Sequence, residues 1–166
     1  MHIARGLQRL QIKGFDSREN VSGDVPDILQ SKAFGYLQGN MSLVCSASKL
    51  AFTMLTDSSK QSSLVIQENK ILKHVTESEL DYILQTGIIT KKKSLALCAR
   101  KNVPYMFMHK TIQEFLASLY IAMNQTETDT ILHAVQLVYC DGSSIFNISQ
   151  LFIFTCGMFP LAAEKM

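Results

Sequence analysis

The sequence lacks the motifs by which nucleotide-hydrolysing enzymes hold a triphosphate. It contains no G-x-x-x-x-G-K-[ST] phosphate loop, so it offers neither a backbone cradle nor a loop lysine for the phosphates. It has no acidic pair after a hydrophobic strand, which a magnesium-positioning Walker B motif requires. His2, His74 and His133 stand in unrelated contexts, so no nucleophile can be paired with a histidine base. We therefore expect no catalytic site and no nucleotide hydrolysis by this chain alone.

Paired cysteines are missing as well. The sequence has four cysteines, Cys45, Cys98, Cys140 and Cys156, and none of them forms a C-x-x-C pair. This spacing indicates neither a zinc site nor a disulfide framework. Small hydrophobic cysteines in a reducing compartment are the simplest interpretation, so we expect no bound metal and a cytoplasmic location.

Long apolar runs and strong charge are also absent. The longest apolar run, Ile148 to Phe159, is interrupted by polar residues and is too short to span a bilayer, so we expect no membrane partner. The N-terminal stretch MHIARGLQRLQIKG has no apolar core, which predicts no signal peptide. The net charge is +2 and the one basic cluster, Lys91 to Lys93, is short, so we expect no nucleic-acid partner.

Regular structure is predicted from Met41 onward. Residues 1–40 are weakly patterned and contain a polar, turn-rich stretch that is typical of a linker. Residues 41–56 place their apolar side chains on one helical face and predict a helix. After a serine-rich break, the short apolar run at 64–66 favours a strand.

A capped helix and a β-hairpin are predicted next. Thr76 and Glu79 form a T-x-x-E capping box, and the helix that follows, 77–86, should stop at Gly87. A strand begins at 88–90. The segments SLALCAR and VPYMFMH on either side of Asn102 then predict a hairpin, of the kind that forms the wing of a winged helix.

The segment YMFMHKTIQEFLASLY, 105–120, predicts a buried strand that leads directly into a helix, with His109 at the junction. Thr111 and Glu114 match a second capping box, which predicts a helix from 111 to 123. A histidine delivered to a helix N-terminus is placed to meet an anionic phosphate, and Lys110 beside it would help to attract one. The structural alternative is a capped core helix behind a histidine with a local partner, and a solvated Lys110.

One face of this helix is apolar at the i, i+3, i+4, i+7 spacing. It carries Ile112, Phe115, Leu116, Leu119, Tyr120 and Met123. We assign Phe107 and the larger apolar residues of this face to the core.

Three further helices are expected towards the C-terminus. Residues 129–139 and 147–156 predict two of them, with Gly157 as the terminator of the second. Pro160 should begin a third helix, PLAAEKM, which is cut short. The expected fold class is therefore mainly α with a small β-hairpin.

The segment around His109 resembles the end of the winged-helix domain of NOD-like receptors, the NACHT-containing class of signal-transduction NTPases. The family pattern is F-x-H-x-[ST]-x-Q-E-F-x-A-A-x-Y. The chain supplies Phe107, His109, Thr111, Gln113, Glu114, Phe115, Leu116, Ala117 and Tyr120. Ser118 stands where alanine is usual. The resemblance covers about residues 41–166, because ISQLFIFTCGMFP is similar to the opening of the next helical domain.

This resemblance implies three regions. Residues 1–40 would be a linker or a remnant of the preceding nucleotide-binding and helical region, to which LQIKGFDSREN is similar. Residues 41–124 would be a winged-helix domain. Residues 125–166 would be the truncated start of a second helical domain, which suggests a fragment of a larger receptor.

The function implied is regulatory, in cytoplasmic innate immune signalling. In the family, the histidine of the motif contacts the β-phosphate of ADP and helps to hold the receptor closed; by position it is His109 here. The ADP would be held by a separate nucleotide-binding domain, the expected partner, and exchange for ATP would release the contact. The chain alone would bind no cofactor, and other receptor copies would be partners on oligomerisation.

Two alternatives remain open. The first is a DNA-binding winged helix, which requires a basic recognition helix, whereas the helix at 77–86 carries Glu77, Glu79 and Asp81 and no lysine or arginine. The second is a truncated decoy, or a non-functional receptor remnant, that makes no contact with nucleotide.

Overall fold

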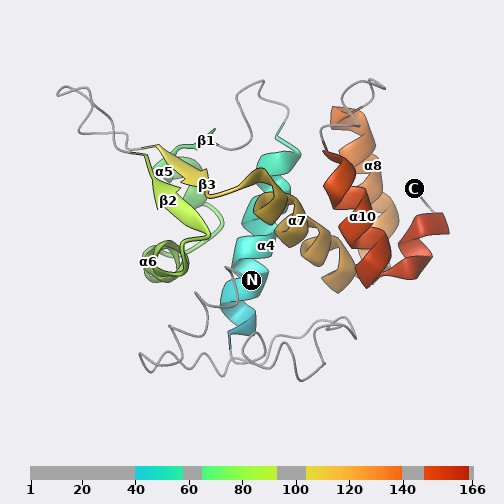
Figure 1. The fold of residues 1–166 in the computed structure, drawn as a ribbon, viewed down its shortest axis with the longest axis horizontal. Helices are drawn as coiled ribbons and strands as arrows, with labels where there is room; N and C mark the ends of the chain where they lie inside the picture. The colour runs from blue at the N-terminus through green and yellow to red at the C-terminus, as the bar shows by residue number, and fades with distance from the viewer. Residues whose placement is uncertain (1–39, 58–64, 93–103, 140–147, 165–166) are drawn as a thin grey trace.

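The computed structural model describes residues 40–57, 65–92, 104–139 and 148–164. These residues form a mainly helical protein with one small antiparallel sheet (Figure 1). The sheet and its short helices lie at one end, and the C-terminal helices lie at the other. Helices α4 (Met41–Leu55) and α7 (Lys110–Met123) occupy the middle and pack against each other. The predicted fold class, mainly α with a small hairpin, is confirmed at this level.

Helix α4 is the centre of the core. Its buried residues recur on one face, as its apolar spacing predicts. Leu50 and Ala51 are completely buried, because α7 covers one side of the helix and α6 (Glu77–Thr86) contacts another. The expected helix at 41–56 is therefore confirmed to within one residue.

The sheet contains β1 (Val65–Ile66), β2 (Ile89–Lys91) and β3 (Tyr105–Phe107), in the order β1-β3-β2. Both edge strands run antiparallel to β3, with Val65 opposite Met106 and Ile89 opposite Phe107. Side chains alternate across a strand, so Tyr105 and Phe107 enter the core while Met106 is only partly buried. The strands expected at 64–66 and 88–90 are confirmed, whereas the hairpin arm SLALCAR lies outside the described residues.

Helix α5 (Glu68–Ile71) leads to α6, whose two ends are determined by local sequence. The Thr76 hydroxyl accepts from the Glu79 N–H at 3.2 Å, and the Glu79 carboxylate accepts from the Thr76 N–H at 2.8 Å. This is the predicted capping box. The helix ends at Gly87, whose φ of 76° is in the left-handed region that favours glycine, as predicted.

Glu79 also connects two helices. Its other carboxylate oxygen accepts a 2.6 Å hydrogen bond from the Ser46 hydroxyl on α4. Partial burial opposes ionisation, but the hydrogen bonds from Ser46 and Thr76 outweigh it and hold the pKa of Glu79 below its ordinary value. One carboxylate therefore caps α6 and anchors it to α4.

The C-terminal part contains η2 (Gln125–Glu127), α8 (Thr128–Val138), α10 (Ser149–Met158) and η4 (Pro160–Glu164). The helix expected at 129–139 is confirmed. Gly157 does not terminate α10 but lies inside it, because the helix continues along α7 to Met158. Pro160 begins a 3₁₀ helix and not the expected α-helix.

Candidate functional site at the start of helix α7

His109 occupies the junction between β3 and α7, as the sequence predicts. The sheet pairing continues past β3, because the Met108 N–H donates to the Ile88 carbonyl at 3.0 Å. His109 then has an extended backbone, with φ −149° and ψ 141°, and is the N-cap residue of α7. Its side chain is exposed. The imidazole is therefore accessible, and its backbone is fixed by a strand on one side and a helix on the other.

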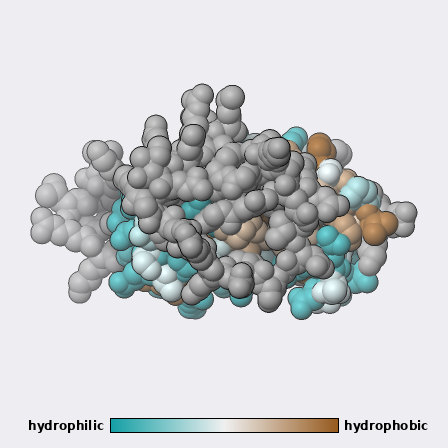
Figure 2. Space-filling model, turned by 90° about the horizontal axis from the view of Figure 1, so that it is seen from below, coloured by the Kyte–Doolittle hydropathy of each residue, from teal (hydrophilic) through white to brown (hydrophobic). Residues whose placement is uncertain are grey.

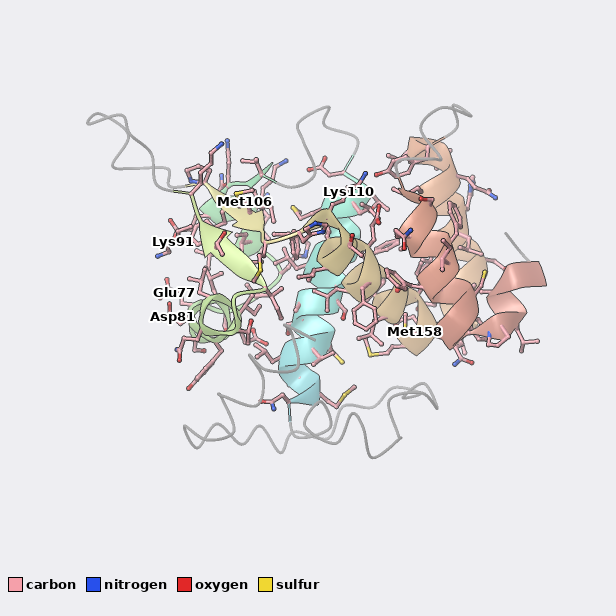
Figure 3. All side chains as sticks on the ribbon, in the orientation of Figure 1. Glu77, Asp81, Lys91, Met106, Lys110 and Met158 are labelled. Carbon is pink, nitrogen blue, oxygen red and sulfur yellow. The ribbon has the colours of Figure 1, made fainter. Side chains whose placement is uncertain are left out.

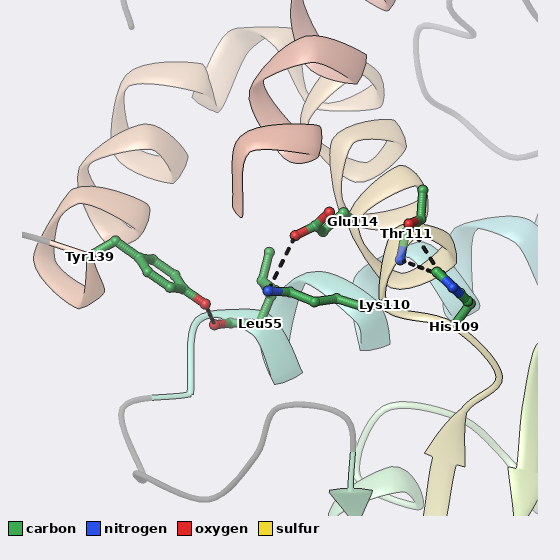
Figure 4. A network of polar contacts seen from close by, with 6 residues as sticks. All are labelled: Leu55, His109, Lys110, Thr111, Glu114 and Tyr139. Atoms are coloured by element: carbon green, nitrogen blue, oxygen red, sulfur yellow. Dashed lines mark hydrogen bonds and ion pairs between the residues drawn. The ribbon is translucent and has the colours of Figure 1, made fainter. Parts of the chain in front are cut away.

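The ring of His109 caps the helix. Its Nδ1 accepts from the N–H of Thr111 at 3.3 Å, and the Thr111 hydroxyl lies 3.2 Å from the same nitrogen (Figure 4). The His109 carbonyl accepts from the N–H of Ile112 at 3.1 Å. Two free N–H groups of the first turn are thus satisfied by one residue.

The expected capping box of Thr111 and Glu114 is wrong. In such a box, threonine is the N-cap and glutamate is the third helical residue. The helix begins at Lys110, one residue before the expected start, so Thr111 is already inside the first turn. Glu114 is then too far along the helix to reach back to its start. The N-cap is His109 because extended pairing with the sheet ends at Met108.

Glu114 points into the protein and is only 3% exposed. Its one ion pair among the described residues is with Lys110, at 3.8 Å, and that lysine is more than a third exposed. Burial raises the pKa of the Glu114 carboxyl, and the positive charge of Lys110 opposes the increase. Sequence reasoning gave Glu114 a capping role and missed this buried carboxyl.

Lys110 and His109 extend in different directions. In Figure 4 the Lys110 ammonium reaches towards Glu114, and the imidazole lies on the other side of the helix start. The expected assistance of Lys110 in attracting phosphate therefore has a local competitor, the buried carboxylate.

A further polar contact closes the same region from α8. The Tyr139 hydroxyl donates to the Leu55 carbonyl at the end of α4, at 2.8 Å (Figure 4). Burial raises the pKa of Tyr139, and the nearby Glu114 charge adds to the effect. Neither Tyr139 nor Leu55 stands out in sequence, because the contact joins residues 84 positions apart.

The apolar residues of the motif lie in or against the core. Phe107, Leu116 and Leu119 are buried, as predicted. Phe115 and Tyr120 are partly buried and make aromatic pairs, edge-to-face with Phe154 and stacked on Phe52 respectively. The second face of α7 is also buried and includes the polar residues Gln113 and Ser118, which the amphipathic pattern did not predict.

The other titratable residues give no second site near His109. His74 lies in the turn before α6, as expected, and burial together with Lys49 and Lys73 lowers its pKa. His133 is exposed on α8, and His2 is outside the described residues. In the part of the chain that the structure describes, no group of three or more potential metal-ligating residues comes together. Each helix described there is too short or insufficiently apolar to cross a membrane.

Comparison with known proteins finds no relative for this chain: no protein-family model, no curated protein and no solved structure matches it. The argument about function therefore rests on the resemblance of the motif and on the geometry around His109.

Proposed function

We propose that this chain is the regulatory, autoinhibitory winged-helix part of a NOD-like receptor in cytoplasmic innate immune signalling. In this proposal it acts through contacts between domains and not through catalysis. His109 meets the β-phosphate of ADP held by the nucleotide-binding domain of the receptor, and this contact keeps the receptor closed. Exchange of ADP for ATP removes the contact and lets the winged helix move away.

The arrangement around the sheet supports the winged-helix proposal. Helix α4 is followed by a strand, then by α5 and α6, and then by the antiparallel pair β2 and β3. The early strand β1 joins the far edge of β3, so a hairpin is attached to a compact group of helices. This is the order of elements that a winged helix at 41–124 requires.

The observation that carries the functional proposal is the position of His109. The residue that matches the phosphate-contacting histidine of the family pattern is exposed, and it lies at the N-terminus of a 14-residue helix. The free N–H groups and the dipole of such a terminus favour an anion. The core residues of the motif explain its apolar positions, but packing does not account for an exposed imidazole.

The energy available matches a switch of moderate strength. A hydrogen bond from histidine to a charged phosphate contributes about 1.5–3 kcal/mol. A difference of this size shifts a two-state equilibrium by roughly ten- to a hundredfold. One contact at His109 is therefore sufficient to bias a receptor towards its closed state, while leaving it reversible.

The charge on α6 weighs against the DNA-binding alternative. Glu77 and Asp81 are both exposed on its outer face (Figure 3), and the helix contains no lysine or arginine. A helix that carries these charges is repelled by the phosphates of the major groove.

The experiment that tests the phosphate contact uses two substitutions of one residue in the receptor that contains this segment. His109→Ala removes both the cap and the imidazole. His109→Asn keeps a side-chain oxygen that caps α7, because asparagine is a preferred N-cap residue, but it removes the imidazole. We expect both variants to release labelled ADP roughly ten- to a hundredfold faster and to raise basal signalling. An unchanged ADP release rate in the asparagine variant would remove the assignment.

Sequencing the full transcript upstream of the Met1 codon separates the proposal from the remnant alternative. An in-frame phosphate loop upstream would supply the nucleotide-binding domain that the proposal needs. A transcript that encodes no such domain would favour a decoy or a non-functional remnant.

A further inference from the structure

The two ring nitrogens of His109 have different surroundings. Nδ1 faces the first turn of α7, where the backbone N–H of Thr111 donates to it at 3.3 Å. The Thr111 hydroxyl lies 3.2 Å from the same nitrogen. The side chain as a whole is exposed, so its other nitrogen is available to an external group.

These contacts determine which nitrogen carries the proton. A neutral imidazole has one N–H donor and one acceptor nitrogen, and the hydrogen bond made by one nitrogen sets the role of the other. A backbone N–H can only donate, so Nδ1 must be the acceptor. The Thr111 hydroxyl is then a second donor to the same lone pair, an arrangement known from other three-centre hydrogen bonds. The proton of the neutral ring is left on Nε2.

We infer that Thr111 is a positioning residue that holds His109 in the neutral Nε2–H tautomer, so that the site offers a fixed donor to a phosphate oxygen. The identity of the ligand rests on the proposed function, whereas the tautomer follows from the contacts of this chain alone. Recognition then depends on the direction of one N–H group and needs no positive charge on the ring.

The inference restricts the chemistry of the site. A nitrogen that carries a proton has no lone pair for a metal ion, so Nε2 is not a metal ligand in this state. A ligand that meets His109 must supply an acceptor atom, as the oxygens of a phosphate do. Lys110 does not compensate for the missing ring charge, because its ammonium is paired with Glu114 at 3.8 Å.

Long-range ¹H–¹⁵N NMR of the imidazole rings of this chain tests the inference directly, since the ¹⁵N shifts report which nitrogen is protonated. His109→Gln identifies the His109 signals. His133, exposed on α8, is the internal reference for an unconstrained ring. At a pH at which the rings are neutral, we expect the Nε2–H to Nδ1–H ratio of His109 to exceed that of His133 by about tenfold, the factor that a net hydrogen bond supplies.

Substitution of Thr111 tests its role as the positioning residue. Thr111→Ala keeps helix propensity but removes the hydroxyl, and we expect the His109 ratio to fall towards the His133 ratio. Thr111→Ser retains the hydroxyl and should keep the wild-type ratio. An altered ratio in the alanine variant alone supports the inference, because a purely structural role of Thr111 would leave the tautomer unchanged. Equal ratios for His109 and His133 in the wild-type chain, or a His109 ratio unaffected by Thr111→Ala, would overturn it.

The outcomes for the tautomer and for the proposed function are independent. A fixed Nε2–H tautomer together with unchanged ADP release in the His109→Asn receptor would refute the phosphate contact and leave the assignment of Thr111 intact. An unconstrained ring with faster ADP release would do the reverse.

Discussion

The two ends of the molecule are stabilised in different ways. The sheet region, which we define as residues 65–92 and 104–107, is held by specific polar contacts. Its helix α6 has a complete capping box, and the buried Tyr105 donates a 2.6 Å hydrogen bond to Glu68. The C-terminal helices, α8, α10 and η4, differ: α8 and α10 begin without a side-chain capping bond.

The surfaces differ in the same sense. Leu137, Ile153 and Leu161 at the C-terminal end are 68%, 60% and 62% exposed, more than any large hydrophobic residue of the sheet region. Figure 2 shows hydrophobic surface at this end of the molecule. The sheet region is therefore largely defined by its own contacts, whereas the C-terminal helices depend on packing against α7.

Substitution in the core of the sheet region should have the largest effect. Phe107 is 1% exposed, and Phe107→Ala should reduce the free energy of unfolding by about 3–5 kcal/mol, because it removes a buried ring and leaves a cavity. Leu137→Ala, at the exposed end, should change it by less than about 0.5 kcal/mol. Urea denaturation measures both. A loss from Leu137→Ala as large as that from Phe107→Ala would break the comparison between the two ends.

The two described glycines sharpen the comparison with opposite signs. Gly87→Ala should destabilise the protein by about 1–2 kcal/mol, because its φ of 76° strains an L-residue and the new Cβ would lie 3.2 Å from Met108 Cε. Gly157→Ala should stabilise it by about 0.5–1 kcal/mol, because the residue is helical and no atom lies within 4 Å of the new Cβ.

Thermal unfolding of the two glycine variants gives the sign of each change. Stabilisation by Gly87→Ala would contradict the left-handed helix end. Destabilisation by Gly157→Ala would show that α10 does not continue through this residue.

The smallest expected effect is a difference in pH dependence between two carboxyls. The pKa of Glu79 is lowered in the folded protein, so its contribution to stability is present above its ordinary value of 4.5 and is lost as the pH falls through the folded pKa. The pKa of Glu114 is raised, so its contribution is greatest below 4.5 and is lost as the pH rises through the folded pKa. The glutamine variants should reveal these opposite trends.

Unfolding free energies measured between about pH 4 and pH 7 test both trends. Relative to the wild-type chain, Glu79→Gln should become progressively less favourable as the pH rises, because the wild-type carboxylate gains its hydrogen bonds from Ser46 and Thr76. Glu114→Gln should become progressively more favourable over the same range. Parallel trends in the two variants would show that the environments of the carboxyls do not differ as the structure indicates.

The accuracy of the sequence-based predictions follows how local each feature is. The Thr76–Glu79 box and the end of α6 at Gly87 were predicted correctly, because all their partners lie within one helix and its flanking residues. The same motif at Thr111 and Glu114 gave a wrong prediction. There the start of the helix depends on where pairing between Met108 and Ile88 ends, and those residues are far apart in sequence.

Tertiary packing also decided the roles of individual side chains. The sequence placed His109 correctly at the strand–helix junction, but only the folded structure shows that its ring caps α7. Glu114 is buried because α7 is covered on more than its apolar face. Gly157 resembles a helix terminator in sequence, yet contacts with α7 accompany α10 past it.

The sequence by itself determined the helical and strand segments, the capping of α6 and the position of His109, since these depend on side-chain periodicity and on hydrogen bonds between near neighbours. Only the tertiary structure decided which helix face is covered, which carboxyl loses its water and which nitrogen of His109 is free. Burial and long-range hydrogen bonds are properties of segments brought together by folding, and no local pattern encodes them.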